Sequence, residues 1–194
     1  MKKIVLSLIF ILTIFVLPTH AFAQDNQEPS MDDTAKVMKE KTQIATPAAK
    51  IQYDLAYPGT LPDSPFYKLK LLRDRIASFL ISDPKKKTEY LLLQTDKGIL
   101  AAAILVDKGN TKLAAETALK AENNYTLLTQ ELGKFPRKPD NEFFKKLQNA
   151  ALKHQEVLDS LSKRVKGDDK KTFEAVKDFS KRNWETIKDY QEQI

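Results

Sequence analysis

From residue 65 onward, apolar residues recur every three or four positions along the chain. This spacing places them on one side of an α-helix, whereas a half-buried strand would show strict alternation. The pattern therefore predicts an all-α fold without strands, arranged as a bundle or an extended array of about five helices. The expected helices cover residues 65–80, 84–108, 111–132, 141–165 and 168–190.

The first expected helix carries a single apolar stripe. At about 100° per residue, the members of this stripe fall within one arc of the helix. We expect the stripe to face the core. It consists of Phe66, Leu69, Leu72, Ile76, Phe79 and Leu80.

The second expected helix follows a predicted N-cap at Asp83 and is apolar on most sides, which is typical of a central helix. A glycine within a helix costs about 1 kcal/mol relative to alanine, so we expect Gly98 to permit close approach of a neighbouring helix. The third expected helix is that neighbour, because the short connection makes the two antiparallel. The facing stripes are Leu91, Thr95, Gly98, Ala102 and Leu105, and Ala114, Ala118, Ala121, Tyr125, Leu128 and Leu132.

The last two expected helices each carry one further apolar stripe. Their members are Phe143, Leu147, Ala151, His154, Leu158, Leu161 and Val165, and then Phe173, Val176, Phe179, Trp184, Ile187 and Tyr190. About 130 helical residues are enough for one core. The sequence leaves open whether the first three and the last two helices share that core.

A Pro/Gly-rich segment precedes the first expected helix. Pro58-Gly59 is typical of a type II turn, and Asp63-Ser64-Pro65 resembles a helix start. We interpret the segment as a strap across the bundle that is fixed by Tyr57, Leu61 and Phe66. The alternative interpretation is a rigid loop that Pro58-Gly59 presents to a partner.

The same segment contains a recognisable box of residues. Its members are Tyr57, Pro58, Gly59, Leu61, Pro62, Asp63, Pro65, Phe66, Tyr67, Leu69, Arg73 and Asp74, followed by Asp83-Pro84-Lys85-Lys86-Lys87. This box resembles the DUF5667 family, a bacterial domain family of unknown function. The resemblance implies a long helical region after the box, from about Tyr57 to Tyr190, and it implies no particular activity.

The N-terminus has the pattern of a signal peptide. Lys2 and Lys3 precede an apolar run over residues 4–17, and Ala21-Phe22-Ala23 fits a cleavage site. The run is shorter than the ~20 residues that span a bilayer, although an uncleaved membrane anchor is the alternative. We expect a signal peptide over 1–23, a flexible linker over 24–56 and a helical domain over 57–194. The protein is then exported, to the periplasm, the cell surface or the medium.

The charge of the chain is +6, and removal of Lys2 and Lys3 with the leader leaves +4. The basic residues are interleaved with nearly as many acidic ones, which is typical of a solvated helical surface that keeps the protein soluble. The alternative for an exported protein is that the positive balance attracts anionic cell-wall polymers or lipid head groups. Three lysines, Lys85, Lys86 and Lys87, begin the second expected helix and oppose its dipole. We regard them as a possible anion contact.

Few residues suggest catalysis. The chain has no cysteine, and His154 is the only histidine beyond the leader. His154 lies on an apolar stripe, which favours a packed imidazole, and Asp168-Asp169 are expected to cap a helix rather than bind a cation. No phosphate-binding loop or nucleophile elbow occurs. We therefore expect no enzymatic activity, cofactor, metal, nucleic-acid partner or small-molecule substrate.

One charge lies within the first apolar stripe. Arg73 would meet Glu89 or Asp96 of the second helix if the two helices are antiparallel, because all three lie at similar heights from the turn. We therefore predict a partly buried ion pair from Arg73 to Asp96 or Glu89.

The function that the sequence favours is that of an exported, non-catalytic structural or interaction module. Its expected partner is another envelope protein or an envelope surface, contacted through a helix face. The alternative is a binder of anionic wall polymer or lipid head groups through the lysine-rich helix starts. The sequence leaves open the identity of the partner, any ligand and the oligomeric state.

Overall fold

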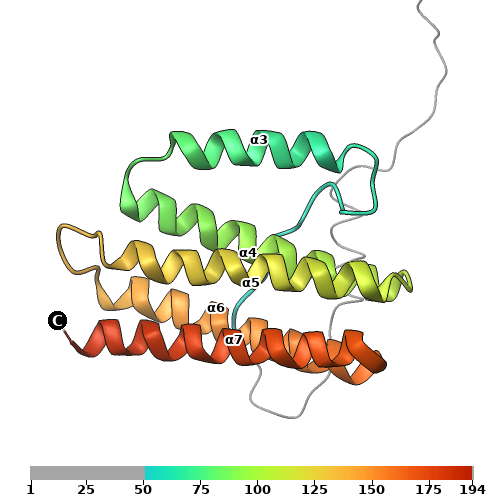
Figure 1. Ribbon diagram of the computed structural model, residues 1–194. Helices are drawn as coiled ribbons and strands as arrows, with labels where there is room; N and C mark the ends of the chain where they lie inside the picture. The colour runs from blue at the N-terminus through green and yellow to red at the C-terminus, as the bar shows by residue number, and fades with distance from the viewer. Residues whose placement is uncertain (1–50, 194) are drawn as a thin grey trace, which may run out of the picture. The chain divides into compact units, whose positions relative to one another are not determined.

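The computed structural model describes residues 51–193, which contain five α-helices and no strand (Figure 1). The predicted fold class is thus confirmed. The helices are α3 (Tyr67–Leu80), α4 (Pro84–Asp107), α5 (Thr111–Leu132), α6 (Asn141–Arg164) and α7 (Gly167–Glu192). The predicted signal peptide and nearly all of the predicted linker lie outside the described residues.

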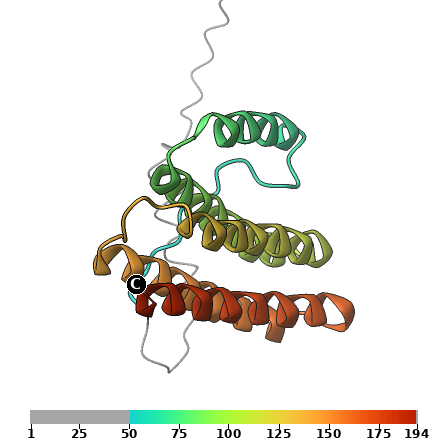
Figure 2. The same ribbon diagram turned by 60° about the vertical axis from the view of Figure 1, so that its left-hand side comes forward.

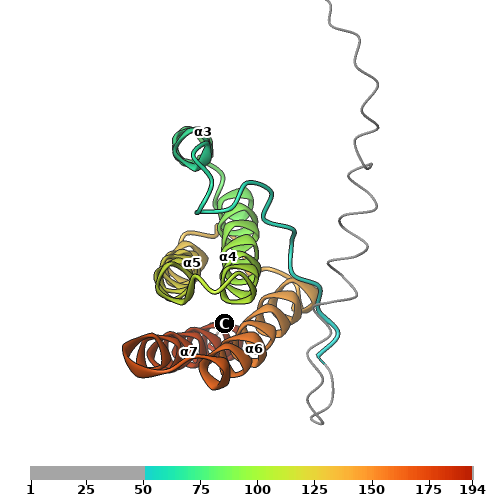
Figure 3. The same cartoon turned by 90° about the vertical axis from the view of Figure 1, so that its right-hand side faces the viewer.

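Helices α4 to α7 form one four-helix bundle. α4 packs beside α5, α6 beside α7, and the two pairs contact each other through α5 with α7 and α4 with α6. Figure 3 shows this arrangement nearly end on. The question of one bundle or an extended array is therefore decided in favour of one bundle for these four helices.

The core consists of two clusters of buried apolar residues. Each cluster draws side chains from all four helices of the bundle. The expected stripes of α5 and α6 are fully buried, and α7 buries Phe173, Val176 and Ile187. Trp184 and Tyr190 of the α7 stripe are partly buried, and Phe179 is 40% exposed.

Helices α4 and α5 approach each other closely at Gly98. A Cβ atom placed on Gly98 would lie 2.4 Å from the Cβ of Ala121. Only glycine therefore fits between the two backbones at this point, and the predicted role of Gly98 is confirmed.

Helix termini follow from local chemistry. The Asp83 side chain accepts a hydrogen bond of 2.8 Å from the backbone N–H of Lys86, with Pro84 at the first helical position. Asp140 caps α6 in the same way through Phe143. In the strap, Gly59 has a φ of 65°, the left-handed conformation that the Pro58-Gly59 turn requires. The predicted N-cap and turn glycine are confirmed.

Two of the three residues predicted to fix the strap do not anchor it, whereas the third, Leu61, is partly buried. Tyr53 and Leu55 pack against the core clusters. Tyr57 is 48% exposed and Phe66 is 68% exposed, so neither anchors the strap. The anchors lie upstream of the box, in residues that the prediction had assigned to the flexible linker.

Helix α3 turns its apolar stripe away from the core, whereas the stripe was predicted to face it. It lies alongside α4, away from α6 and α7 (Figures 1 and 2), and it buries none of its residues. The six residues of its apolar stripe are 53–86% exposed. The prediction that this stripe faces the core is wrong, because α4 to α7 already close the core and α3 meets α4 mainly through polar groups.

Candidate functional site

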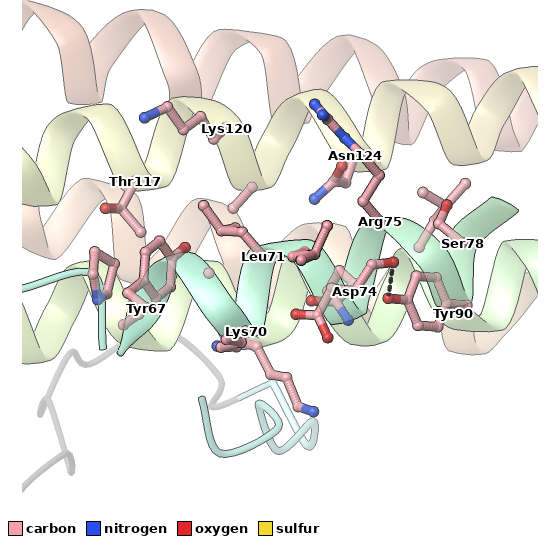
Figure 4. Close-up of a pocket in the computed structure, with 18 of the residues that line it drawn as sticks. Tyr67, Lys70, Leu71, Asp74, Arg75, Ser78, Tyr90, Thr117, Lys120 and Asn124 are labelled. Carbon is pink, nitrogen blue, oxygen red and sulfur yellow. Dashed lines mark hydrogen bonds between the residues drawn. The ribbon is translucent and has the colours of Figure 1, made fainter. Parts of the chain in front are cut away.

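A groove of about 930 Å³ lies between α3, α4 and α5 (Figure 4). α3 forms one wall, α5 forms the other, and the residues of α4 lie between them. Figure 4 shows Leu71 and Arg75 on the side of α3 that faces α5. The groove exists because α3 is held beside the bundle without closing onto α5.

Polar contacts hold α3 in this position. The Tyr90 hydroxyl donates to the backbone oxygen of Asp74 over 2.9 Å. The Lys87 Nζ donates to the hydroxyl of Ser78 over 2.8 Å and to the Ser78 backbone oxygen. Lys70 donates to the strap, at the backbone oxygens of Pro58 (2.7 Å) and Thr60 (3.2 Å). These contacts use the polar side of α3 and leave its apolar side uncovered.

The charge of the groove is strongly positive. Among residues 51–193, its lining contains six cationic side chains and one carboxylate, that of Asp74. Burial lowers the pKa of Lys70, and the nearby charges of Lys97 and Arg73 lower it further, against the opposing effect of Asp74. The cations are Lys68, Lys70, Arg75, Lys87, Lys97 and Lys120.

The lining of the groove is also apolar in part. Leu71, Leu72 and Phe79 line it from α3, and Leu127 lines it from α5. All four are exposed. The lining also includes small residues, namely Gly98 and Ala101 of α4 and Ala121 of α5. The groove therefore combines apolar contact surface with a surrounding positive charge.

The predicted ion pair between α3 and α4 does not form. The side chain of Arg73 is 69% exposed and binds its neighbour Asp74, with Nη2 2.8 Å from Oδ1. Glu89 is exposed, and Asp96 is bonded to other residues. The prediction failed because it assumed that the stripe containing Arg73 faces α4, whereas that stripe points away from it.

Asp96 belongs instead to a buried polar network at the centre of the bundle. His154 Nε2 lies 2.9 Å from Asp96 Oδ1, and His154 Nδ1 lies 3.5 Å from Glu122 Oε2. Asn183 donates to the other Glu122 oxygen over 3.0 Å. The Tyr53 hydroxyl donates to Asp96 Oδ2 over 2.8 Å. Each of the four bundle helices thus contributes one polar side chain, and Tyr53, upstream of the strap, contributes a fifth.

The electrostatics of this network favour a charged imidazole. Burial lowers the pKa of His154, but the hydrogen bond to Asp96 and the Glu122 carboxylate outweigh burial and raise the pKa to about 9. Burial, together with the charge and the hydrogen bond of Asp96, raises the pKa of Tyr53. The network therefore favours the protonated form of His154 at neutral pH.

The network is suited to stabilising the bundle rather than to chemistry on a substrate. His154 is fully buried, as expected for a packed imidazole. Within residues 51–193, no group of three or more acidic or histidine side chains is placed to hold a metal ion. Among the helices of this part of the chain, none is long and apolar enough to cross a membrane.

Several residues of these sites were not found from the sequence. Glu122 interrupts an otherwise apolar face of α5, next to Ala121 and Tyr125, and this is the one local signal for a buried charge. Asn183 and Tyr53 carry no such signal because their partners come from distant parts of the chain. The groove was missed because it depends on where α3 lies.

The three lysines of the predicted anion contact, Lys85, Lys86 and Lys87, lie in different environments. Lys87 is bonded to Ser78 of α3, and Lys85 lies over the ring of Phe143, 5.8 Å from its centroid. Lys86 is exposed. The three lysines therefore do not form one site, and only Lys87 lines the groove.

The remaining box residues are mostly structural. Pro58 is buried, and Asp63 forms an ion pair of 2.8 Å with Lys108 at the end of α4. Burial, with the charge of Asp74, raises the pKa of Tyr67, which lies in the groove. Leu69 belongs to the exposed stripe of α3. The box thus fixes α3 and one end of the groove.

Comparison with known proteins gives a family and no function. No curated protein and no solved structure matches the chain. Residues 59–168, more than half of the chain, match the family described as Domain of unknown function (DUF5667). The match begins within the box and ends at the start of α7, so it is shorter than the span from Tyr57 to Tyr190 that the resemblance implied. The chain belongs to the DUF5667 family.

Proposed function

We propose that this protein is an exported, non-catalytic helical module that binds another protein of the cell envelope through α3 and the adjacent groove. The observation that carries the proposal is the apolar stripe of α3, whose six members are all exposed and which no other residue of 51–193 covers. Contiguous apolar surface of this kind typically marks an interaction site. The two core clusters contain no residue of α3, so the stripe is available to a partner.

The contacts of α3 support a role in presentation. Tyr90 and Lys87 of α4 and the strap backbone hold the helix at defined points. A helix fixed in this way loses little conformational entropy when a partner binds to its apolar side. The burial of His154 supports a non-catalytic role, because its imidazole is bonded to Asp96 and has no exposed surface.

Site-specific photo-crosslinking in cells tests the proposal. A photoreactive residue at position 79 on α3 is expected to form a discrete adduct with an envelope protein. The matched control is position 179 on α7, which also carries an exposed phenylalanine. Adducts of equal yield at both positions, or none at position 79, would contradict the proposal.

Binding of an anionic wall polymer or of lipid head groups is the alternative that the same module allows. Lys85 and Lys86 are the lysines at the start of α4 that are not bonded to α3. Sedimentation of the purified protein with protein-stripped envelopes distinguishes this alternative from binding to an envelope protein. Binding that is lost at high salt and in a Lys85→Gln/Lys86→Gln variant would favour the polymer or lipid over a protein partner.

A further inference from the structure

We propose that the groove between α3 and α5 binds an acidic amphipathic helix of a partner protein. This inference rests on the proposed function and specifies the chemistry of the partner. Its basis is a concave site with apolar walls and an excess of cations that have no counter-charge in the part of the chain that the structure describes.

The dimensions of the groove suit a helix. α3 is 14 residues long, which corresponds to about 21 Å at 1.5 Å per residue. A partner helix of similar length would lie along α3 and α5, in the position of a further helix beside α4. The small residues Gly98 and Ala101 of α4 and Ala121 of α5 also line the groove.

The apolar residues of the groove are placed on both walls. Leu72 and Phe79 lie seven residues apart on α3, which is two helical turns, and Leu127 lies on α5. An amphipathic helix offers apolar side chains at spacings of three, four and seven residues. Helices recognised in grooves use this spacing for their anchoring residues.

The charges specify an acidic partner. Lys68, Arg75, Lys97 and Lys120 line the groove and form no ion pair or hydrogen bond with any other side chain of residues 51–193. The single carboxylate of the lining, Asp74, is bonded to Arg73. Glu or Asp residues on the flanks of a bound helix would neutralise these cations.

The alternative occupants fit less well. A second copy of this chain carries a net positive charge, so it would add to the positive charge of the groove rather than neutralise it. An anionic membrane surface is flat, whereas the cations come from three helices around a concavity. A membrane is therefore an outcome of the test rather than part of the proposal.

The test measures binding of a labelled peptide to the purified protein by fluorescence anisotropy. The probe is a designed amphipathic peptide of the length of α3, with a leucine stripe and glutamates on both flanks. The control peptide has glutamine in place of every glutamate. We expect the glutamate peptide to bind at least about tenfold more tightly, with an affinity that falls as salt rises.

Matched protein variants locate the binding site. Arg75→Gln with Lys120→Gln removes one cation from each wall and is expected to weaken peptide binding about tenfold. Lys145→Gln with Lys146→Gln removes the same charge from exposed positions of α6 outside the groove, and we expect a change in affinity of less than about twofold.

A second pair of variants tests the apolar contacts. Leu72→Ser with Phe79→Ser should also weaken peptide binding, whereas Leu119→Ser with Phe179→Ser should not. All of these side chains are exposed, so the variants are expected to fold.

Several results would overturn the inference. They are equal affinity for the two peptides, no binding of either, an equal loss in the α6 variant, or binding of phosphatidylglycerol vesicles without binding of the peptide. A cross-link from position 79 to a basic or neutral partner segment would overturn this inference and uphold the proposed function. Peptide binding without any cross-link at position 79 would support the groove's specificity and contradict the proposed function.

Discussion

His154 is an imidazolium held without any contact with solvent. Burial alone would favour its neutral form, yet Asp96 and Glu122 raise the pKa to about 9. A buried charge is tolerated where opposite charges and hydrogen bonds compensate it. Tyr53 and Asn183 supply hydrogen bonds to the two carboxylates, so the strap and three helices depend on the protonation of one side chain of α6.

The stability of the protein should therefore fall as the pH rises through the pKa of His154. The pKa of about 9 in the folded protein lies above the ordinary histidine value of 6.5, so the stabilisation is fully present below pH 6.5 and is lost between pH 6.5 and 9. A shift of this size corresponds to roughly 3 kcal/mol. Urea unfolding at several pH values measures it. In a His154→Gln variant, this fall in stability between pH 6.5 and 9 should be absent. An unchanged pH dependence would show that another group causes it.

Removal of the Tyr53 hydroxyl should loosen the strap. Tyr53→Phe deletes the hydrogen bond to Asp96, and bonds to charged groups contribute about 1.5–3 kcal/mol. Tyr57→Phe is the matched control because Tyr57 is exposed, and we expect it to change stability by less than about 0.5 kcal/mol. Thermal unfolding of both variants measures the difference. Equal effects would mean that Tyr53 does not anchor the strap.

At the scale of the residue, the sequence was a better guide to which side chains are buried than to which hydrogen-bond or ion-pair partners they have. The position of His154 on an apolar stripe was enough to predict a packed imidazole. Its bonds to Asp96 and Glu122 depend on the relative heights of three helices, which no local pattern contains. The same limit explains the wrong partner for Arg73, because the prediction had the right height on α4 and the wrong face of α3.

At the scale of the element, periodicity predicted the extent of each helix and left open what covers its apolar side. The observed bounds of α4 and α6 differ from the predicted ones by one residue. α3 shows a clear stripe, yet α4 to α7 bury their own stripes against each other and leave no place for it in the core. An amphipathic helix that the core does not need is free to serve as a binding surface.

Substitutions in the α3 stripe should accordingly have little effect on stability. Ile76→Ser and Phe79→Ser alter side chains that are exposed by 53% and 86%, and we expect changes within about 0.5 kcal/mol. Phe144→Ala, which removes a buried ring of α6, should cost about 3–5 kcal/mol. Chemical denaturation measures the free energy of unfolding of the three variants. A large loss from Phe79→Ser would mean that the stripe is buried in solution.

Gly98 offers a test of the packing of α4 on α5. Gly98→Ala places a Cβ 2.4 Å from the Cβ of Ala121, and such overpacking costs about 1–3 kcal/mol. Adding Ala121→Gly removes the second Cβ and should recover part of that loss. The double-mutant cycle measures the coupling between the two positions. Additive effects would show that the two residues do not meet.

At the scale of the whole molecule, the bundle, the strap and α3 have separate roles. The four-helix bundle supplies stability without any disulfide, since the chain has no cysteine. Tyr53, upstream of the strap, anchors the chain to the centre of the bundle, and the strap connects this anchor to α3, which forms one wall of the groove. The composition and the five helical patterns were enough to predict the all-α class, whereas the groove required the arrangement in space.

The proposed function requires the protein to leave the cytoplasm, and this gives a prediction for the mature chain. Lys2 and Lys3, the apolar run over residues 4–17 and Ala21-Phe22-Ala23 together fit cleavage by signal peptidase. Intact mass spectrometry of the exported protein should therefore give a chain that begins at Gln24. An Ala23→Leu substitution provides the control, because a large residue at the cleavage site should leave precursor in the membrane fraction. A wild-type chain that retains Met1 or Lys2 outside the cytoplasm would replace the cleaved form with a membrane-anchored one, and the groove would then act close to the membrane surface.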